Sequence, residues 1–367
     1  MKGDVLMATI HILGLGAGNK AQLPLGVYQT LKHAQPLFVR TKEHPVISEL
    51  EAEGLTYIAF DEVYERHRDF QLVYEEIVSL LFEAAKKHGT IYYAVPGHPL
   101  VAEQTVQMLL SEGRKEKVSI HIGGGQSFLD PLFARLKIDP NDGCVILDGT
   151  SLALSQLNPR LHHIITQVYD RFVASEVKLT LMELYPDEYT ITVVTAVGVP
   201  GQEQLLEIPL YELDRVIDLN NLTAVYVPPT TDETVLNRLY HQSRDIFRTL
   251  RGPDGCPWDK EQTHQSLKKY VLEEAREVCE AIDQEDMDQL KEELGDLLLQ
   301  VFLQAQIAEE EGWFNMEDVL QALNEKMIRR HPHVFGDLSL KDADDVKRQW
   351  EKIKEEEYKQ KQNRQQR

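Results

Sequence analysis

The chain has 367 residues, of which 42% are hydrophobic, and this length suggests two or three domains rather than one. A formal net charge of −21 argues against non-specific binding of DNA, RNA or an anionic membrane, although it allows a polyanionic substrate that metal ions bridge. No apolar run is long enough to span a bilayer, and no signal sequence is evident at the N-terminus. The three cysteines, Cys144, Cys256 and Cys279, form no C-x-x-C pair, which indicates a reducing cytoplasm.

The N-terminal half alternates strand patterns with helix patterns. Apolar strands run into glycine-rich loops or turns, and a long helix is expected from Phe70 to about His88. This alternation predicts an α/β fold with a largely parallel sheet covered on both faces. After about residue 162 the pattern becomes that of a smaller, mixed α/β subdomain. Strands are expected within 8–18, 36–41, 55–60, 90–99, 118–125 and 144–150.

Glycine-rich loops follow two of these strands, at the edge where parallel sheets bind ligands. The first loop is GLGAG at 14–18, and the second contains Gly97. Glycine lets the backbone approach a ligand closely and adopt positive φ. By itself, however, G-x-G-x-G also fits a simple tight turn from strand to helix.

Four segments together resemble the tetrapyrrole methylase family, namely 14–18, 41–50, 92–106 and 123–136. The resemblance spans about residues 8–228. It implies a fold of two α/β subdomains with S-adenosylmethionine bound in the cleft between them. The positions that match cofactor-binding residues are Leu15, Gly16, Pro96, Gly97, His98 and Val101.

The central loop departs from the family pattern. Many members carry Gly-Asp-Pro there, whereas this chain has Gly97-His98-Pro99. A histidine can donate or accept a hydrogen bond, but it lacks the fixed negative charge that could complement a sulfonium. Methyl transfer is therefore left open, and nothing in the sequence identifies a methyl acceptor.

Pro228 and Pro229 end the last expected strand and mark the domain boundary, so we expect domains at 1–228 and 229–367. Asp232 can cap a helix that stops at Gly252, and every later element has a helical pattern. The C-terminal domain is thus predicted to be all-α.

A loop before the main helices delivers Trp258. This ring could stack on a nucleobase, or it could fill the end of a helical bundle. The nearby Lys260 could approach phosphates or could remain solvated at the surface.

Two acidic clusters in the segment 270–300 dominate the C-terminal half. Glu274 and Glu277 are three residues apart, as are Glu293 and Asp296, so each pair shares one face of a helix. A polar break centred near Glu285 predicts an antiparallel hairpin. Glu277 and Glu293 are each eight residues from this centre, and Glu274 and Asp296 are each eleven, so all four carboxylates are expected at matching heights.

Four carboxylates that face one another repel unless a cation lies among them. No lysine or arginine stands three or four residues from any of the four, so pairing within a helix does not relieve them. Hard oxygen ligands in a half-apolar setting suit Mg²⁺ or Mn²⁺. A solvated acidic stripe is the plainer alternative. A di-iron site would need Glu-x-x-His pairs, and neither cluster contains a histidine.

A third helix is expected after Asn315, and basic residues gather at its C-terminal end. Cations near an acidic metal site would suit a triphosphate, because metals bind some oxygens and cations bind others. The same residues could instead complement the helix dipole. The predicted nucleotide-binding residues are Trp258, Lys260, Lys326, Arg329 and Arg330.

The pattern Glu-Glu-x-x-Glu followed by Glu-x-x-Asp resembles the MazG-type nucleoside triphosphate pyrophosphohydrolases. Flanking motifs at 251–267, 309–319 and 329–337 occur in the family's order, so the resemblance covers about 232–358. It implies an Mg²⁺-dependent enzyme that splits nucleoside triphosphates into monophosphate and pyrophosphate, and a homodimer that completes the site. By position, Glu274, Glu277, Glu293 and Asp296 would bind metal. Glu273 would be an accessory ligand or would orient water, and it or Glu277 would accept a proton.

Two other functions remain open from the sequence. The chain could be mainly a methyltransferase whose helical part serves for dimerisation. Alternatively, the α/β half could sense S-adenosylmethionine and regulate hydrolysis without methylating anything.

Overall fold

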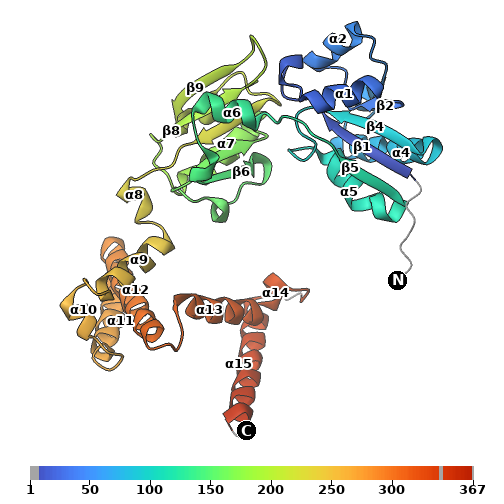
Figure 1. The fold of residues 1–367 in the computed structure, drawn as a ribbon. Helices are drawn as coiled ribbons and strands as arrows, with labels where there is room; N and C mark the ends of the chain where they lie inside the picture. Colours follow the sequence, from blue (N-terminus) through green and yellow to red (C-terminus); the bar gives the residue numbers. More distant parts are fainter. Residues whose placement is uncertain (1–7, 339–341, 366–367) are drawn as a thin grey trace. The chain divides into compact units, whose positions relative to one another are not determined.

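The computed structural model describes residues 8–338 and 342–365, and the chain separates into two compact units. These are an N-terminal unit, Met1–Val235, and a helical unit, Leu236–Arg367 (Figure 1). The division falls after Val235 rather than after residue 228. In the part of the chain that the structure describes, no helix is both long and apolar enough to cross a membrane.

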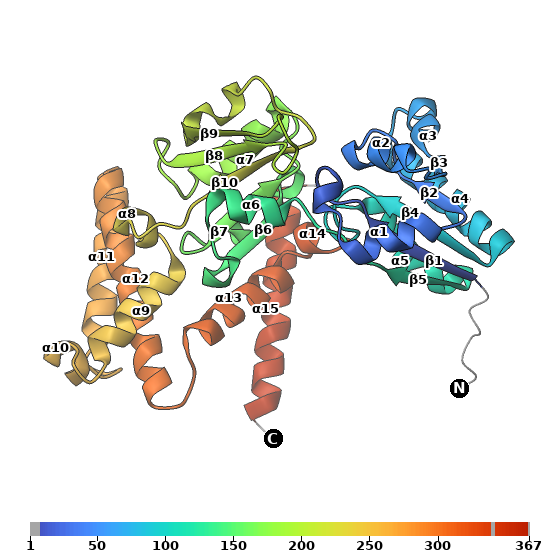
Figure 2. The same ribbon diagram turned by 45° about the horizontal axis from the view of Figure 1, so that its top comes forward.

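The first sheet of the N-terminal unit is parallel throughout, in the order β3-β2-β4-β1-β5. Alternate residues of β1 face opposite sides, because successive side chains of a strand point to opposite faces. Ile10 and Ile12 join the core under α4 and α5, whereas Leu13 joins the core under α1 and α2. The prediction of a parallel sheet with helices on both faces is therefore confirmed for this half (Figure 2). The elements are β1 Ala8–Gly14, α1 Leu25–His33, β2 Leu37–Val39, α2 Pro45–Ala52, β3 Ile58–Ala59, α3 Asp61–Arg66, α4 Phe70–His88, β4 Thr90–Val95, α5 Gln104–Glu116 and β5 Val118–Ile122.

The second sheet is mixed, in the order β6-β7-β10-β8-β9. Only β6 and β7 run parallel, and the other pairs are antiparallel. The strand at 144–150 was expected with the first sheet, but it pairs with β7 in the second. The strand pattern records only that a segment is extended and apolar, not which partner it finds. The elements are α6 Leu129–Leu136, β6 Cys144–Asp148, β7 His162–Thr166, α7 Arg171–Met182, β8 Thr190–Thr195, β9 Gln204–Pro209 and β10 Thr223–Val227.

Where the structure describes the helical unit, its regular elements are all helices, as the sequence predicts. One expected helix, from Asp232 to Arg251, is instead broken at Leu239, whose backbone is extended. The break separates buried Val235, which belongs to the N-terminal unit, from a helix that packs within the helical unit. Asn315 caps the third long helix as expected, by accepting a hydrogen bond from the Asp318 amide. The elements are α8 Glu233–Leu236, α9 Tyr240–Arg251, α10 Pro257–Glu261, α11 Lys268–Asp283, α12 Met287–Glu310, α13 Met316–Arg330, α14 Pro332–Phe335 and α15 Ala343–Gln365.

Helices α11 and α12 form the antiparallel hairpin that positions the acidic residues. The turn between them contains Glu285, which adopts a positive φ of 54°. Leu267, just before α11, packs on Leu303 and Ile307 of α12 and closes the open end of the hairpin. On the same part of α12, Phe302 packs against Met316 at the start of α13. The apolar contacts therefore lie at the end of the hairpin away from the turn.

Candidate metal centre and cofactor cleft

The acidic residues of the hairpin lie in the seam between α11 and α12. Glu274 and Glu277 on α11 and Glu293 and Asp296 on α12 are all half-buried, whereas their neighbours Glu273 and Glu292 are exposed. Carboxylate oxygens of Glu274, Glu277 and Glu293 lie within 4.8 Å of one another. The structure therefore brings together three of the four predicted metal ligands as one possible ligand set.

The electrostatics of Glu274 place the fourth acid beside this set. Burial raises the pKa of Glu274, and the charges of Asp296, Glu277, Glu273 and Glu293 raise it further, with Asp296 the largest of these charges. Each group makes the charged form of its neighbour less favourable. A divalent cation bound among these oxygens would reverse the effect, since it favours ionised carboxylates.

Contrary to expectation, pairing within α11 does reach one of the four acids, Glu277. Arg276 lies beside Glu277, with a guanidinium nitrogen 3.9 Å from its carboxylate, and also pairs with Glu280 at 3.3 Å. The spacing rule considered only positions three and four residues away and missed this contact between sequence neighbours. The Arg276 side chain is largely exposed, so solvent screens its charge and the cluster remains strongly acidic.

An aromatic pair adjoins the acidic cluster. The ring of Trp258, on α10, meets that of Tyr270 edge to face with centroids 6.1 Å apart, and half of the Trp258 surface is exposed. Tyr270 is one helical turn before Glu274 on the same side of α11. The Lys260 ammonium donates a hydrogen bond to the Pro253 carbonyl at 2.7 Å and so helps to close the loop that carries Trp258.

The predicted basic residues lie at the far end of α13. The guanidinium groups of Arg329 and Arg330 both bind the Glu357 carboxylate of α15, each at 2.6 Å. These bonds, led by the one from Arg330, hold the pKa of Glu357 at about 2. One acid therefore partly neutralises the two arginines.

Helix α13 contacts α12 near its own start, through Met316, Val319 and Leu320. From there it runs away from the α11–α12 hairpin (Figures 1 and 2). A single chain therefore does not bring Lys326, Arg329 and Arg330 to the acidic cluster.

In the N-terminal unit the two predicted loops meet. The backbones of Gly16 and Gly97 exchange two hydrogen bonds, at 2.8 and 3.2 Å, and the Leu15 amide donates to the Val95 carbonyl at 2.8 Å. A Cβ on Gly14 would lie 2.8 Å from the Gly125 Cα, so only glycine permits this approach of the loops. The six predicted cofactor residues thus belong to two loops joined by their backbones.

The central loop also reaches the second subdomain. Val101 packs against the apolar cluster under α6, which includes Leu132 and Ile164. The His98 side chain accepts a hydrogen bond from the Leu100 amide at 3.1 Å, so its Nδ1 stabilises the turn. Through Val101 the central loop thus contacts the second subdomain.

Two polar contacts beside these loops were not found from the sequence. His44 lies with its Nε2 3.0 Å from the Gly16 carbonyl oxygen, and burial lowers the pKa of its imidazole. Glu103, which follows the central loop, is buried and pairs with Arg40 at 2.6 Å. The only signal for His44 was its place in the family-like segment 41–50. The pair of Arg40 and Glu103, 63 residues apart, left no pattern that spacing could detect.

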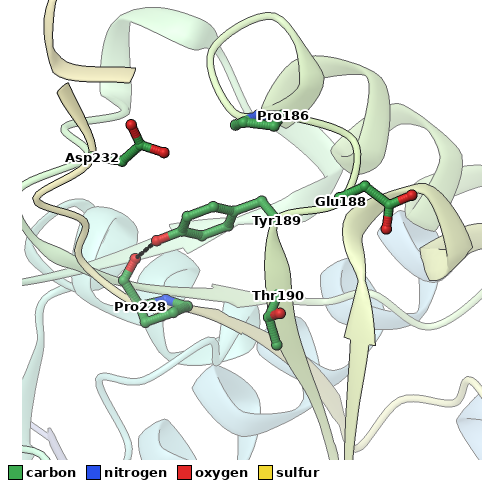
Figure 3. Close-up of a pocket in the computed structure, with 6 residues that line it drawn as sticks. All are labelled: Pro186, Glu188, Tyr189, Thr190, Pro228 and Asp232. Carbon is green, nitrogen blue, oxygen red and sulfur yellow. Dashed lines mark hydrogen bonds between the residues drawn. The ribbon is translucent and has the colours of Figure 1, made fainter. Parts of the chain in front are cut away.

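An open recess of about 420 Å³ lies elsewhere on the N-terminal unit, beside the second sheet (Figure 3). The Tyr189 hydroxyl there donates to the Pro228 carbonyl at 2.8 Å and anchors the segment that leaves β10. None of the residues predicted to bind metal, nucleotide or cofactor lines this recess, which is formed by Pro186, Glu188, Tyr189, Thr190, Pro228 and Asp232.

Both units match known protein families. Residues 9–214 match the family model of tetrapyrrole (corrin/porphyrin) methylases, and residues 262–335 match that of the MazG nucleotide pyrophosphohydrolase domain. The uncharacterized protein YabN of Bacillus subtilis (strain 168) is 53% identical over 95% of this chain and 71% of its own length.

Relatives of the helical unit are matched over a shorter region. The nucleoside triphosphate pyrophosphohydrolase/pyrophosphatase MazG of Thermotoga maritima is 55% identical over 30% of this chain and 45% of its own length. The nucleoside triphosphate pyrophosphohydrolase of Escherichia coli (strain K12) is 52% identical over 32% and 44%, respectively. The chain therefore matches less than half of each of these two proteins.

Fold and site together define a two-part protein, in which an α/β unit with paired glycine loops precedes a helical unit with an acidic hairpin. The chain belongs to the tetrapyrrole methylase family and carries a MazG domain in its C-terminal part. The similarity to YabN extends over both parts, because the match covers 95% of this chain. The family prediction from the sequence is confirmed for both parts.

The raised pKa of Glu274 makes the stability of the hairpin depend on pH. A carboxyl whose pKa is raised by folding stabilises the folded state below its ordinary pKa, and this contribution is lost as pH rises through the raised value. Without divalent cations, Glu274→Gln should therefore stabilise the helical unit at neutral pH, by roughly 0.5 kcal/mol, as for other like-charge helical neighbours. Thermal unfolding in EDTA, with hydrogen exchange of α11 to locate the change, measures this.

The matched control is Glu292→Gln, which removes one charge from an exposed neighbour of Glu293. This control should change stability less than Glu274→Gln does. Adding Mg²⁺ should raise the unfolding temperature of the wild type and of Glu292→Gln, but much less that of Glu274→Gln. Equal responses of the two variants would show that Glu274 does not belong to a metal site.

Proposed function

We propose that the helical unit is an Mg²⁺-dependent nucleoside triphosphate pyrophosphohydrolase, which converts a nucleoside triphosphate and water to the monophosphate and pyrophosphate. The observation that carries the proposal is the meeting of Glu274, Glu277 and Glu293 in the hairpin seam. It is supported by the MazG domain match and by relatives, 52–55% identical in this region, that are named for this activity.

The donor set fits the proposed ion. All its atoms are carboxylate oxygens, which Mg²⁺ and Mn²⁺ prefer. Burial raises the pKa of Glu274 most, and the unbalanced negative charge of the neighbouring acids raises it further. The metal residues would be Glu274, Glu277, Glu293 and Asp296. Bound there, the ion would lower the pKa of a water molecule and neutralise the charge of a triphosphate.

The protein's own groups would then direct the reaction. Glu273, which is exposed beside the cluster, or a free oxygen of Glu277 would accept the proton of the attacking water. Attack at the α-phosphorus would break its bond to the bridging oxygen and release pyrophosphate. Trp258 would hold the base by stacking, with Lys260 in the same loop.

A homodimer would complete the site. Leu294, Leu298 and Val301 form an exposed apolar stripe on α12, and the stripe continues into Phe302 and Ala305, which α9 and α13 cover. Burying such a stripe against a second copy would be favourable. The partner could also supply the basic residues of α13, which do not reach the acids of their own chain.

For the N-terminal unit we propose binding of S-adenosylmethionine in the cleft between its subdomains. Support comes from membership of the methylase family, from the pairing of Gly16 with Gly97 and from the packing of Val101 between the subdomains. The unit would act as a methyltransferase for an acceptor still to be found, or as a cofactor sensor. Both activities are proposed for the cytoplasm, with nucleoside triphosphates as partners and without nucleic acid or membrane.

Product analysis tests the hydrolase. Wild-type protein incubated with a panel of nucleoside triphosphates and Mg²⁺ should release monophosphate and pyrophosphate, and EDTA should abolish the reaction. Glu277→Gln and Asp296→Asn should each lower kcat by about a hundredfold or more, as expected when a ligand of a catalytic metal is lost. Glu292→Gln is the control and should remain active. Nucleoside diphosphate and inorganic phosphate as products would contradict the proposal, because they arise from attack at the γ-phosphorus.

Light scattering after gel filtration tests the dimer. The wild-type chain should have twice the mass of the monomer, and Leu298→Glu should shift it towards the monomer because a charge would be buried at the contact. Activity per chain should fall in parallel, if the site needs both copies. Circular dichroism verifies that the variant remains helical. A wild-type monomer with full activity would contradict the proposal.

Calorimetry with S-adenosylmethionine tests the N-terminal unit. We expect saturable binding that Gly97→Val weakens at least tenfold, since Gly97 has a positive φ of 65° that a β-branched residue disfavours. Hydrolysis measured with and without the cofactor then separates a sensor, which changes the rate, from an independent methyltransferase. Absence of binding heat and of any change in unfolding temperature would exclude both versions.

A further inference from the structure

The loop between α9 and α11, which contains the short helix α10 and Trp258, is held by a buried arginine for which the sequence predicts no role. Arg251 is the last residue of α9, and only 7% of its side chain is exposed. We propose that Arg251 is a positioning residue that sets the Trp258 ring beside the acidic cluster and thereby sets the affinity for the nucleoside. This inference rests on the proposed hydrolase function.

The guanidinium of Arg251 binds on two sides. Its Nε and Nη2 donate to both carboxylate oxygens of Glu310, on the last turn of α12, at 2.8–3.0 Å. Its Nη1 donates to the backbone carbonyls of Asp259 and Gln262, the latter at 3.2 Å. One planar group thus joins the end of α12 to the end of α10.

These two carbonyls belong to the C-terminal turn of the short helix that carries Trp258. The Asp259 carbonyl also accepts a hydrogen bond from the Gln262 backbone amide, at 3.2 Å, so the Arg251 guanidinium is a further donor, from outside the helix, that holds this end of α10. A lysine could not replace the arginine fully, because it lacks the rigid fork that binds a carboxylate and two carbonyls at once. The orientation of α10 therefore depends on the Arg251 side chain.

The loop is compact enough to transmit this constraint to Trp258. A Cβ on Gly255 would overlap the carbonyl oxygens of Thr249 and Leu250, so the loop lies directly on the end of α9. The Gln262 amide side chain also donates to the Trp258 carbonyl, at 2.9 Å. A displacement of α10 would therefore move the tryptophan as well.

From Trp258 the connection to the acids is short. The Trp258 ring lies against Tyr270, and Tyr270 precedes Glu274 by one helical turn, a rise of about 6 Å. That is a suitable distance for a base to stack while its phosphates reach the acidic cluster. Positioning of the ring should hence affect nucleotide affinity, whereas the chemistry at the α-phosphorus should be little changed.

A neighbouring arginine provides a matched control. Arg248 lies one turn earlier on α9 and binds Glu309 at 2.6 Å, so it also ties α9 to the end of α12. Its described hydrogen bond reaches α12 and not the Trp258 loop. A loss of packing between α9 and α12 would thus appear in both arginine variants, whereas loss of loop positioning would appear only at Arg251.

A double-mutant cycle on the full-length chain tests the proposal. ATP hydrolysis would be measured with excess Mg²⁺ for Arg251→Gln, Trp258→Ala and the double variant. Each single change should raise KM roughly tenfold, the size expected for loss of base stacking, with kcat within about twofold. The double variant should have the KM of Trp258→Ala alone, because Arg251 acts through that ring. Arg248→Gln should keep the wild-type KM.

Several results would overturn the proposal. One is a double variant whose increase in KM is the product of the two single increases. The others are an unchanged KM in a folded Arg251→Gln protein and an equal rise of KM in Arg248→Gln. If Arg251→Gln does not fold, Arg251→Lys and Glu310→Gln take its place, and both must raise KM. The Kd of ATP is measured in parallel for every variant. A wild type that binds ATP without forming monophosphate would refute the hydrolase function, and the double-mutant cycle would then be evaluated from the Kd values.

Discussion

Repulsion among the carboxylates in the seam of the α11–α12 hairpin is the constraint on which the helical unit depends. Helical hairpins usually fill such a seam with apolar side chains, and here Leu267, Leu303 and Ile307 do so at one end. Nearer the turn, Glu274, Glu277 and Glu293 occupy the corresponding positions and face one another. Their mutual charge lowers the stability of the metal-free hairpin, and a cation would relieve it. The repulsion that lowers stability is thus the same feature that a divalent cation would relieve at the proposed metal site.

The remainder of the helical unit can be understood as support for this seam. Arg244, Arg248 and Arg251 of α9 all bind acids beyond the cluster, on the last turns of α12 and the first turn of α13. These ion pairs hold one side of the hairpin and the aromatic loop in place. The other side of α12 remains exposed and apolar around Leu298, where a second copy is proposed to bind. In the proposed enzyme, stability, substrate placement and assembly would thereby involve three different faces of one helix.

Much of both sites could be predicted from local spacing, because helices repeat regularly and a short turn forces antiparallel pairing. Equal distances from Glu285 placed the acids correctly, and Asn315 was recognised as a cap. Contacts between distant segments escaped prediction. The pairing of β6 with β7, the ion pair of Arg40 with Glu103, and the hold of Arg251 on α10 depend on residues that no sequence interval links. Arg329 and Arg330 were identified as basic, but their partner Glu357 lies 27 and 28 residues away on another helix.

The sequence by itself determined the two families, the helical hairpin with its four acids and the two glycine loops, because each is written in residues close together along the chain. Only the tertiary structure decided which charges remain unbalanced. Burial in the seam raises the pKa of Glu274, whereas Glu357 partly neutralises Arg329 and Arg330, and Glu103 is neutralised by Arg40. The physical reason is that electrostatic energy depends on distance and burial in space, and neither can be read from positions along a chain.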